Sequence, residues 1–429
     1  MNFKTVFIRY ISIVYVSLSA IPVHAQNQVL TLETCYQLAR ENYPLIRKQQ
    51  LITETEQYSI ANASKVYLPT LSFAGQATYQ SETVHFPDAL SSLSGISFPE
   101  ISKDQYKVQG ELNQLIFDGG LSKVRKDAAR AQAETEQQSL EVNLYALKER
   151  ITQIYFAILL MDEQIKQNDL RKADLENIAG KTRAALKNGT AYRSNVDELE
   201  AELTTAEMTD IELAANRKAY LQMLSLFTGK NISSSKELVM PAEQPVNSEI
   251  KRPELALFNA QKKTIGVQKE QLRTGYLPQV SAFFQGAYGR PTLNFLENKF
   301  GLWYIGGLRL NWNLGSLYTL SNKKHMLDIS QQSLEADKET FLYNTRLSLI
   351  QQNSEIEKFR QLISKDEKTI SLRASVKKSA QAQLDNGVIT VRDYINYANA
   401  ENQARQTLIL HKIQLLQAQY HFNNISGTN

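Results

Sequence analysis

The chain has 429 residues, of which 42% are hydrophobic and 21% are charged, and its formal net charge at pH 7 is +4. This length is sufficient for two or three ordinary domains or for one elongated domain. Lys4 and Arg9 supply two of the positive charges, so the rest of the chain is nearly balanced and gives no reason to expect nucleic acid or an anionic surface as a partner. The only cysteine, Cys35, excludes an internal disulfide.

An apolar run near the N-terminus predicts a secretory signal peptide over residues 1–25. Lys4 and Arg9 precede the apolar run from Tyr10 to Ile21, and the letters VHAQ offer a cleavage site after Ala25. The run is short for a spanning helix, and a signal anchor is the alternative. Beyond it, no apolar stretch reaches about 18 residues, so the sequence could cross a membrane only with strands.

The same order of landmarks occurs twice, which predicts two copies of one structural unit. NYPLIRKQQ, from Asn42, has a counterpart in RPELALFNA, from Arg252, and a Tyr-Leu-Pro follows each, at Tyr67 and Tyr276. A Leu-x-Asn-Gly also occurs twice, about 198 residues apart. The predicted organisation is a signal peptide at 1–25, a first repeat at 26–230, a linker at 231–251 and a second repeat at 252–429.

A period-two alternation follows each Tyr-Leu-Pro and predicts two hairpins of strands. In the first copy the alternating runs extend from Leu71 to Tyr79 and from Tyr106 to Leu112. In the second copy they extend from Val280 to Tyr288 and from Leu302 to Leu310. Strands of about 9–12 residues can cross a bilayer when tilted, and this alternation is typical of transmembrane barrels. A soluble hairpin with one buried face is the alternative that periodicity leaves open.

The remaining sequence predicts very long helices. No proline interrupts the stretches from Gly120 to Asn188 and from Gly315 to Asn386. At about 1.5 Å per residue, each stretch makes a helix about 100 Å long, whereas an ordinary helix has about 11–12 residues. In the first stretch, apolar residues form a heptad seam typical of helices that wind around each other: Leu140, Leu144, Leu147, Ile151, Ile154, Ile158, Met161 and Ile165.

Four membrane-type strands per chain predict a shared barrel. The smallest transmembrane barrels need about eight strands, and an open sheet in lipid would leave edge amides unpaired. Copies of the chain must therefore contribute to one barrel. Two copies give about eight strands, whose interior is filled by side chains, and three give about twelve strands with room for a lumen. The predicted fold class is mainly α with a transmembrane β part, namely a long α-helical coiled-coil barrel joined to a shared β-barrel to which each chain contributes four strands.

The order and doubling of these motifs resemble the TolC family of outer-membrane efflux and secretion channels. The resemblance rests on NYPL and RPEL, the two YLP strand entries, FDGG and NLGS at the strand exits, and the two NG tips, and it covers about Leu30 to Phe422. It implies a homotrimer with a shared twelve-strand β-barrel in the lipid of a Gram-negative outer membrane, and a large helical tunnel in the periplasm. It also implies docking to a periplasmic adaptor protein and to an inner-membrane pump of the RND or ABC type.

The resemblance further implies a pore entrance at the two helix tips. The family places an Asp a few residues after the tip glycine, and Gly387 and Asp393 have that spacing, so three copies would form a ring of carboxylates that favours cations. Asn396 replaces a second Asp of the family pattern, and Asn195 replaces the Asp of the first copy. Arg392 is either a salt-bridge partner or a solvated side chain. The tip turns, at which the adaptor would dock, are Asn188, Gly189, Asn386 and Gly387.

A local role is the alternative for Asp393. Thr390 and Asp393 have the spacing of a capping box at a helix N-terminus, and so have Ser194 and Asp197 in the first copy. The helix dipole also favours an Asp in the first turn. The two roles are compatible, and the sequence leaves the choice between them open.

No enzymatic activity, cofactor or metal site is expected, because the histidines are scattered and no catalytic or phosphate-binding motif occurs. The sequence instead predicts the exit duct of a tripartite efflux or type I secretion system, which conducts its substrate passively. A structural or adhesive coiled-coil surface protein without a channel is the alternative. Whether the substrate is a drug, a metal ion or a protein stays open.

Overall fold

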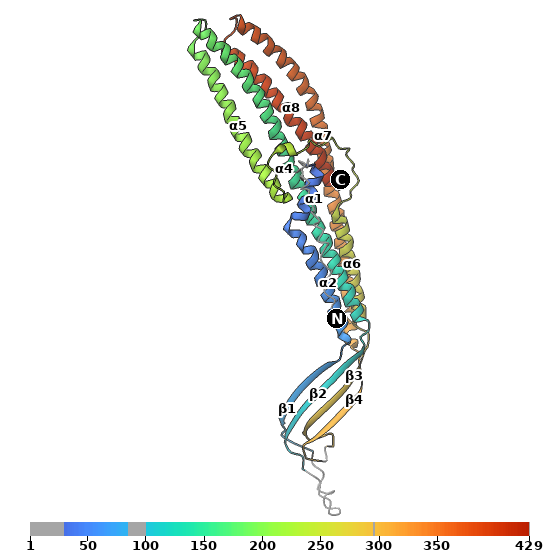
Figure 1. The fold of residues 1–429 in the computed structure, drawn as a ribbon. Helices are drawn as coiled ribbons and strands as arrows, with labels where there is room; N and C mark the ends of the chain where they lie inside the picture. The colour runs from blue at the N-terminus through green and yellow to red at the C-terminus, as the bar shows by residue number, and fades with distance from the viewer. Residues whose placement is uncertain (1–29, 85–99, 295–296, 429) are drawn as a thin grey trace, which may run out of the picture.

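The computed structural model describes residues 30–84, 100–294 and 297–428, so the predicted signal peptide at 1–25 lies outside the described residues. Figure 1 shows an elongated molecule with a small sheet at one end and the tips of two helical hairpins at the other. The chain passes through short helices into the sheet, leaves it along a long helix and returns by a shorter one, and then repeats this path.

Four antiparallel strands lie in the order β1-β2-β3-β4 and confirm the four strands expected from the alternation. They span Thr70–Tyr79 (β1), Asp104–Phe117 (β2), Gln279–Arg290 (β3) and Gly301–Asn311 (β4). Strands β2 and β3 come from different halves of the chain and pair directly, with Gly110 opposite Gly286. The two hairpins therefore join into one sheet, in which β1 and β4 are the edges.

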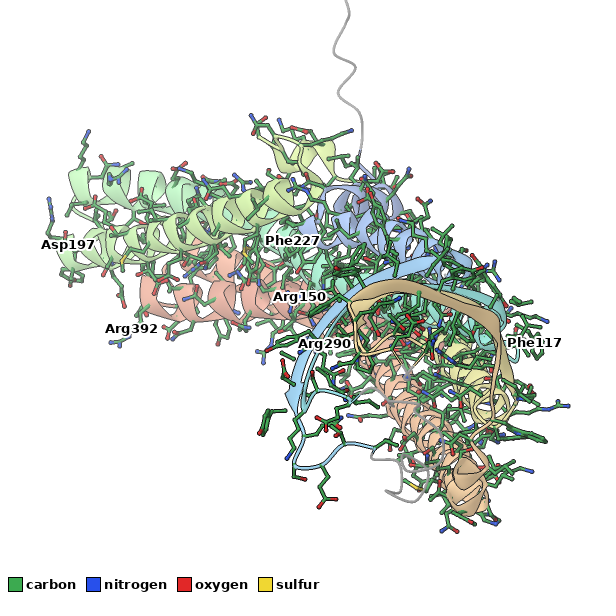
Figure 2. All side chains as sticks on the ribbon, turned by 90° about the horizontal axis from the view of Figure 1, so that it is seen from below. Phe117, Arg150, Asp197, Phe227, Arg290 and Arg392 are labelled. Atoms are coloured by element: carbon green, nitrogen blue, oxygen red, sulfur yellow. The ribbon has the colours of Figure 1, made fainter. Side chains whose placement is uncertain are left out.

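The sheet has one apolar face and one mainly polar face. The register places Leu71, Leu112 and Phe284 in one row across β1, β2 and β3. Large exposed side chains on this apolar face are Leu71, Phe73, Tyr79, Tyr106, Val108, Leu112, Phe284, Tyr288, Leu302, Tyr304, Leu308 and Leu310. On the other face Gln109 and Glu111 are half-buried. Figure 2 shows the sheet from below as a curved arc.

Two long helices leave the sheet. Helix α4 spans Leu121–Lys187 and α7 spans Leu317–Asp385, with 67 and 69 residues, which confirms the predicted long helices. Each turns at its tip into a return helix of 36 residues, α5 (Arg193–Thr228) or α8 (Val391–Ser426). Among the described residues, no helix is long and apolar enough to cross a membrane.

Shorter helices cover the half of α4 and α7 that lies nearer the sheet (Figure 1). They are α1 (Leu32–Asn42), α2 (Lys48–Ser64) and α6 (Pro253–Thr274). Single 3-10 turns occur at Pro44–Arg47, Lys65–Tyr67, Ser235–Glu237 and Leu314–Ser316. The predicted linker at 231–251 lies between α5 and α6, and its exact limits stay a prediction.

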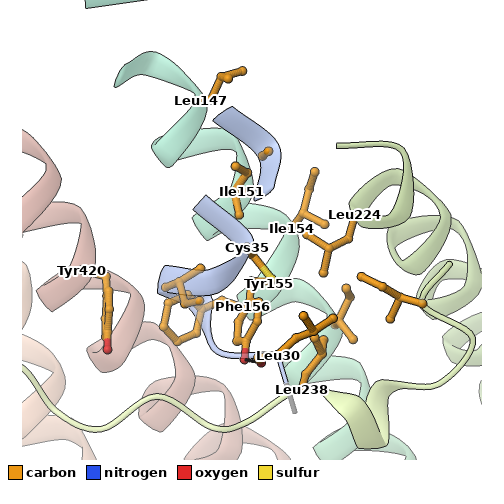
Figure 3. Close-up of a cluster of buried hydrophobic side chains, with 14 of the residues drawn as sticks. Leu30, Cys35, Leu147, Ile151, Ile154, Tyr155, Phe156, Leu224, Leu238 and Tyr420 are labelled. Carbon is orange, nitrogen blue, oxygen red and sulfur yellow. Dashed lines mark hydrogen bonds between the residues drawn. The ribbon is translucent and has the colours of Figure 1, made fainter. Parts of the chain in front are cut away.

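The largest buried apolar cluster lies near the middle of the molecule, where α1, α4, α5 and α8 meet (Figure 3). Six residues of the predicted heptad seam are buried in it: Leu140, Leu144, Leu147, Ile151, Ile154 and Ile158. The hydroxyl of Tyr155, inside this cluster, lies 2.8 Å from the carbonyl oxygen of Leu30 and 2.7 Å from that of Val239. Tyr155, which is next to the seam residue Ile154, therefore holds the start of α1 and the segment between the two halves against α4.

Candidate functional site

The two hairpin tips lie side by side at the end of the molecule opposite the sheet (Figure 1). Gly189 and Gly387 have φ angles of 75° and 68°, the left-handed region that a glycine adopts without steric cost. The N–H of the residue after each glycine, Thr190 or Val388, donates across the last helical turn to the carbonyl of Ala185 or Gln383. Each long helix therefore ends in a Schellman motif, which explains why Asn-Gly occurs at both tips.

A pocket of about 440 Å³ separates the two tips. Asn195 and Thr390 are among the residues that line it. The side chain of Lys181 on α4 lies 3.6 Å from Asp385 at the end of α7, so an exposed ion pair crosses between the hairpins. Asn188 and Asn386 are exposed at the turns themselves, where another protein could reach them.

Asp393 is exposed and caps helix α8. Its Oδ2 accepts hydrogen bonds from the N–H of Thr390 at 3.0 Å and from the Thr390 hydroxyl at 2.6 Å, while its own N–H donates to that hydroxyl oxygen at 3.2 Å. These hydrogen bonds, and after them the charge of Arg392, lower the pKa of the Asp393 carboxyl. The capping box predicted at Thr390 is therefore present, and Asp393 carries a charge at neutral pH.

The capping box predicted at Ser194 in the first copy is wrong. Helix α5 already begins at Arg193, and its N-cap is Tyr192, which makes no capping hydrogen bond with its side chain. Ser194 thus lies inside the first turn, where its hydroxyl cannot act as the cap. Asp197 instead accepts a hydrogen bond from Arg193 at 2.9 Å. The two tips therefore differ in how their return helices begin.

Arg392 and Asn396 both lie on the exposed side of α8. The guanidinium of Arg392 is 3.6 Å from the carboxylate of Glu198 on α5, although the Arg392 side chain is 78% exposed. This ion pair reaches from the second hairpin to the first. An exposed pair contributes little to stability, so its main effect is on the position of the Arg392 side chain.

A charged cluster formed by Asp174, Lys377, Tyr394 and Glu401 connects three helices within about four turns of the tips. The ammonium of Lys377 on α7 lies 2.7 Å from Asp174 on α4 and 3.1 Å from Glu401 on α8. The hydroxyl of Tyr394, which is 1% exposed, donates to Asp174 at 3.2 Å. The cluster thereby ties the second hairpin to α4.

Opposing effects set the pKa of the Lys377 ammonium in this cluster. Burial lowers that pKa, but the hydrogen bond and charge of Asp174 and those of Glu401 outweigh burial and raise it. Burial would likewise raise the pKa of the Glu401 carboxyl, and the hydrogen bonds from Arg405 and Lys377 lower it instead. Lys377 and Glu401 are therefore both ionised at neutral pH and attract each other.

No spacing rule in the sequence could have found this cluster. Asp174 and Tyr394 are separated by 220 residues, and the helix period alone does not reveal which faces of α4 and α8 meet. A buried tyrosine so close to the tip is the one local signal, because a buried tyrosine hydroxyl usually has a partner.

A second polar site fixes the junction between the sheet and α4. Asp118, which is 3% exposed, accepts hydrogen bonds from the Tyr67 hydroxyl at 2.8 Å, the Gly120 N–H at 2.9 Å and the Ser122 N–H at 2.6 Å. Burial alone would raise the pKa of the Asp118 carboxyl, but a hydrogen bond from the Ser122 hydroxyl, together with those from the Ser122 N–H, Tyr67 and Gly120, lowers it. The FDGG motif is therefore a structural joint between strand and helix.

Within the described ranges, no group of three or more His, Cys, Asp and Glu side chains is placed to hold a metal ion.

Comparison with known proteins supports this picture. The family model described as outer membrane efflux protein matches residues 35–230. No curated protein matches the sequence. The fold is similar to that of the outer membrane protein VceC from Vibrio cholerae, with 12% identity and a TM-score of 0.67 over 92% of this chain and 96% of that chain.

Two other solved structures have the same fold. The CmeC outer membrane channel of Campylobacter jejuni gives 13% identity and a TM-score of 0.64, covering 94% of this chain and 86% of that chain. The MtrE outer membrane channel of Neisseria gonorrhoeae gives 14% identity and a TM-score of 0.64, covering 92% of this chain and 88% of that chain.

The match to a family of efflux proteins confirms the predicted transport function and the expectation that the chain is not an enzyme. It also favours a channel over an adhesive coiled coil, which has no reason to share this fold over its whole length. Residues 35–230 thus match the model of the outer membrane efflux protein family, and over 92% and 94% of its length the chain has the fold of the VceC and CmeC outer-membrane proteins, respectively.

Proposed function

We propose that three copies of this chain form one channel, with a barrel of about twelve strands in the outer-membrane lipid and a helical tube in the periplasm. The sheet is the observation that carries this proposal. It has four strands, two unpaired edges and an exposed apolar face. Edges in lipid must be paired, and a cyclic assembly pairs β4 of one copy with β1 of the next.

Within this channel the hairpin tips are the entrance. The exposed turns at Asn188, Gly189, Asn386 and Gly387 lie farthest from the membrane part and dock a periplasmic adaptor protein, which links the channel to an inner-membrane RND or ABC transporter. The two halves of the chain, at 26–230 and 252–429, are copies of one unit, so both tips present a similar turn to the adaptor.

Asp393 and the charged cluster control the entrance. In a trimer, the three Asp393 carboxylates form a ring that favours cations, with Asn396, Asn195 and Arg392 nearby. The charged cluster holds α8 and α7 against α4, so its hydrogen bonds must be broken before the second hairpin can move outward. The lowered pKa of the Asp393 carboxyl keeps the ring charged at periplasmic pH.

The experiment is purification from outer membranes followed by reconstitution in planar lipid bilayers. We expect the protein to require detergent, to have the mass of a trimer by light scattering, and to give discrete conductance steps. Recovery as a monomer that washes off the membrane, without any conductance, would support the adhesive coiled coil instead.

A further inference from the structure

The polar face of the sheet carries one apolar stripe that a simple water-filled duct does not need. Trp303 and Ile305 lie on this face of β4, opposite Ala287 and Gln285 of β3. The ring of Phe283 lies over Gly307, where an added Cβ would come within 3.3 Å of it. Phe283, Ile305 and Trp303 thus line up along β4, and we call them the apolar stripe.

Most of the wall beside the stripe is polar. Among the described strand residues of β1 and β2 on this face, Leu115 near the end of β2 is the one large apolar residue. The others are polar or small: Thr70, Ser72, Ala74, Gln76, Thr78, Gln105, Lys107, Gln109, Glu111 and Asn113. Ile305 is 39% exposed, and Phe283 and Trp303 are half-buried. Because the lipid contacts the opposite face, membrane insertion does not explain these three side chains.

The charges on this face are unequal. Glu111 and Arg309 form an ion pair of 3.1 Å, and the Arg309 guanidinium lies 4.6 Å from the centre of the Phe283 ring. Lys107 forms no ion pair with any residue in the described ranges. Among the described strand residues of this face there is therefore an excess of one positive charge per chain, located on Lys107.

Lys107 lies near one end of the apolar stripe. It is opposite Gly289 of β3, which in turn is opposite Gly301 of β4, two residues before Trp303. Neither glycine has a side chain of its own at this place, and the Cγ2 methyl of Thr292 lies over Gly301, 2.8 Å from the position of an added Cβ. A molecule with an aromatic body and an acidic group could therefore contact the stripe and Lys107 together.

We propose that the inner face of the barrel binds amphipathic aromatic anions in transit, with the rings against the apolar stripe and the acidic group beside Lys107. This inference rests on the proposed channel function and adds a substrate class to it. Stacking on Trp303 and Phe283 removes apolar surface from water, and the low charge density of the wall leaves Lys107 as the main electrostatic contact.

Three probes in planar bilayers test the proposal. Naphthalenesulfonate has both ring and negative charge, naphthyltrimethylammonium has the ring with a positive charge, and methanesulfonate has the charge without the ring. We expect naphthalenesulfonate to interrupt the potassium current, and the other two to need concentrations about tenfold higher for the same block.

Two variants and a matched control locate the site. Trp303→Ala should weaken the block by naphthalenesulfonate about tenfold, whereas Tyr304→Ala, the next residue on the lipid face, should leave it unchanged. Lys107→Gln should abolish the preference for the anion over the cation. Equal block by both ring compounds, or a block that Trp303→Ala does not weaken, would overturn the inference.

A fluorescence measurement tests binding at Trp303 without the Trp303→Ala variant, which could fail to assemble. The chain has two tryptophans, so Trp312→Phe leaves Trp303 as the only indole. Naphthalenesulfonate should quench its emission with saturation, and emission that does not respond would overturn the inference. Normal conductance without any block would refute the binding site alone, whereas absence of conductance in the unmodified protein would refute the channel and the site together.

Discussion

The two roles of Asp393 differ in what they require of its side chain. The cap needs an oxygen that accepts hydrogen bonds from Thr390, whereas a selectivity ring needs the negative charge. Asparagine keeps an acceptor oxygen and removes the charge, and alanine removes both. The pair of substitutions therefore separates the roles that the sequence left open.

We predict that Asp393→Asn and Asp393→Ala lower the cation selectivity of the channel to a similar extent, because both remove the ring of charge. The measurement is the reversal potential in a salt gradient across a planar bilayer. Asp197→Asn is the control, because this carboxylate is exposed at the first tip and pairs locally with Arg193. Unchanged selectivity in both Asp393 variants would reduce this residue to a helix cap.

Residue-scale features were predictable where the interaction is local in sequence. The cap at Thr390 follows from a spacing of three residues, and the tip glycines follow from the need for a positive φ. The same spacing failed at Ser194, because the first-copy helix begins at Arg193 and a motif does not fix where a helix starts. The contact of Tyr394 with Asp174 depends on which helix faces meet, which no local pattern contains.

At the scale of whole elements, the tips depend on the backbone conformation of a single residue in each turn. Gly387 has a positive φ, and an added Cβ would meet nothing within 4 Å, so the cost of a substitution comes from the backbone alone. Gly180 is also free of contacts but lies inside α4 with no positive φ, so it is a matched control.

We predict that Gly387→Ala destabilises the second tip by about 1–2 kcal/mol, because an L-residue is strained in the left-handed region. Gly180→Ala should instead stabilise α4 by about 0.5–1 kcal/mol, since alanine loses less backbone entropy in a helix. Hydrogen exchange of the tip and helix peptides, followed by mass spectrometry, measures both local changes. Equal protection in the two variants would show that the tip does not depend on its glycine.

The charged cluster acts between elements, and its removal should free the second hairpin. Each hydrogen bond to a charged group contributes about 1.5–3 kcal/mol, and Lys377 connects α7 to both α4 and α8. We predict that Lys377→Ala raises the single-channel conductance or the open probability. Lys378→Ala, at the neighbouring exposed position, should leave both quantities unchanged. If neither the conductance nor the open probability rose in Lys377→Ala, the charged cluster would contribute only to the stability of the fold.

For the molecule as a whole, the sequence predicted the long helices and the four strands because periodicity and the absence of proline are visible over many residues. It did not predict that β2 and β3 pair across the two halves, because that register depends on how the hairpins meet in space. The direct pairing makes each chain one continuous part of a barrel wall. An apolar face that continues over all four strands is the consequence.

Two neighbouring residues of β1 test whether the continuous apolar face of the sheet is the one that contacts lipid. Phe73 belongs to the exposed apolar face, and Ala74 lies on the opposite, polar face. An arginine facing lipid near the middle of the bilayer costs about 2–4 kcal/mol, whereas an arginine facing a water-filled lumen costs little. Phe73→Arg should therefore reduce the amount of trimer in the outer membrane, while Ala74→Arg should assemble normally and shift the ion selectivity toward anions. Immunoblots of membrane fractions measure the amount of trimer, and bilayer recordings measure the ion selectivity. If Phe73→Arg assembled normally and Ala74→Arg did not, the face that carries Ala74 would be the one that contacts lipid.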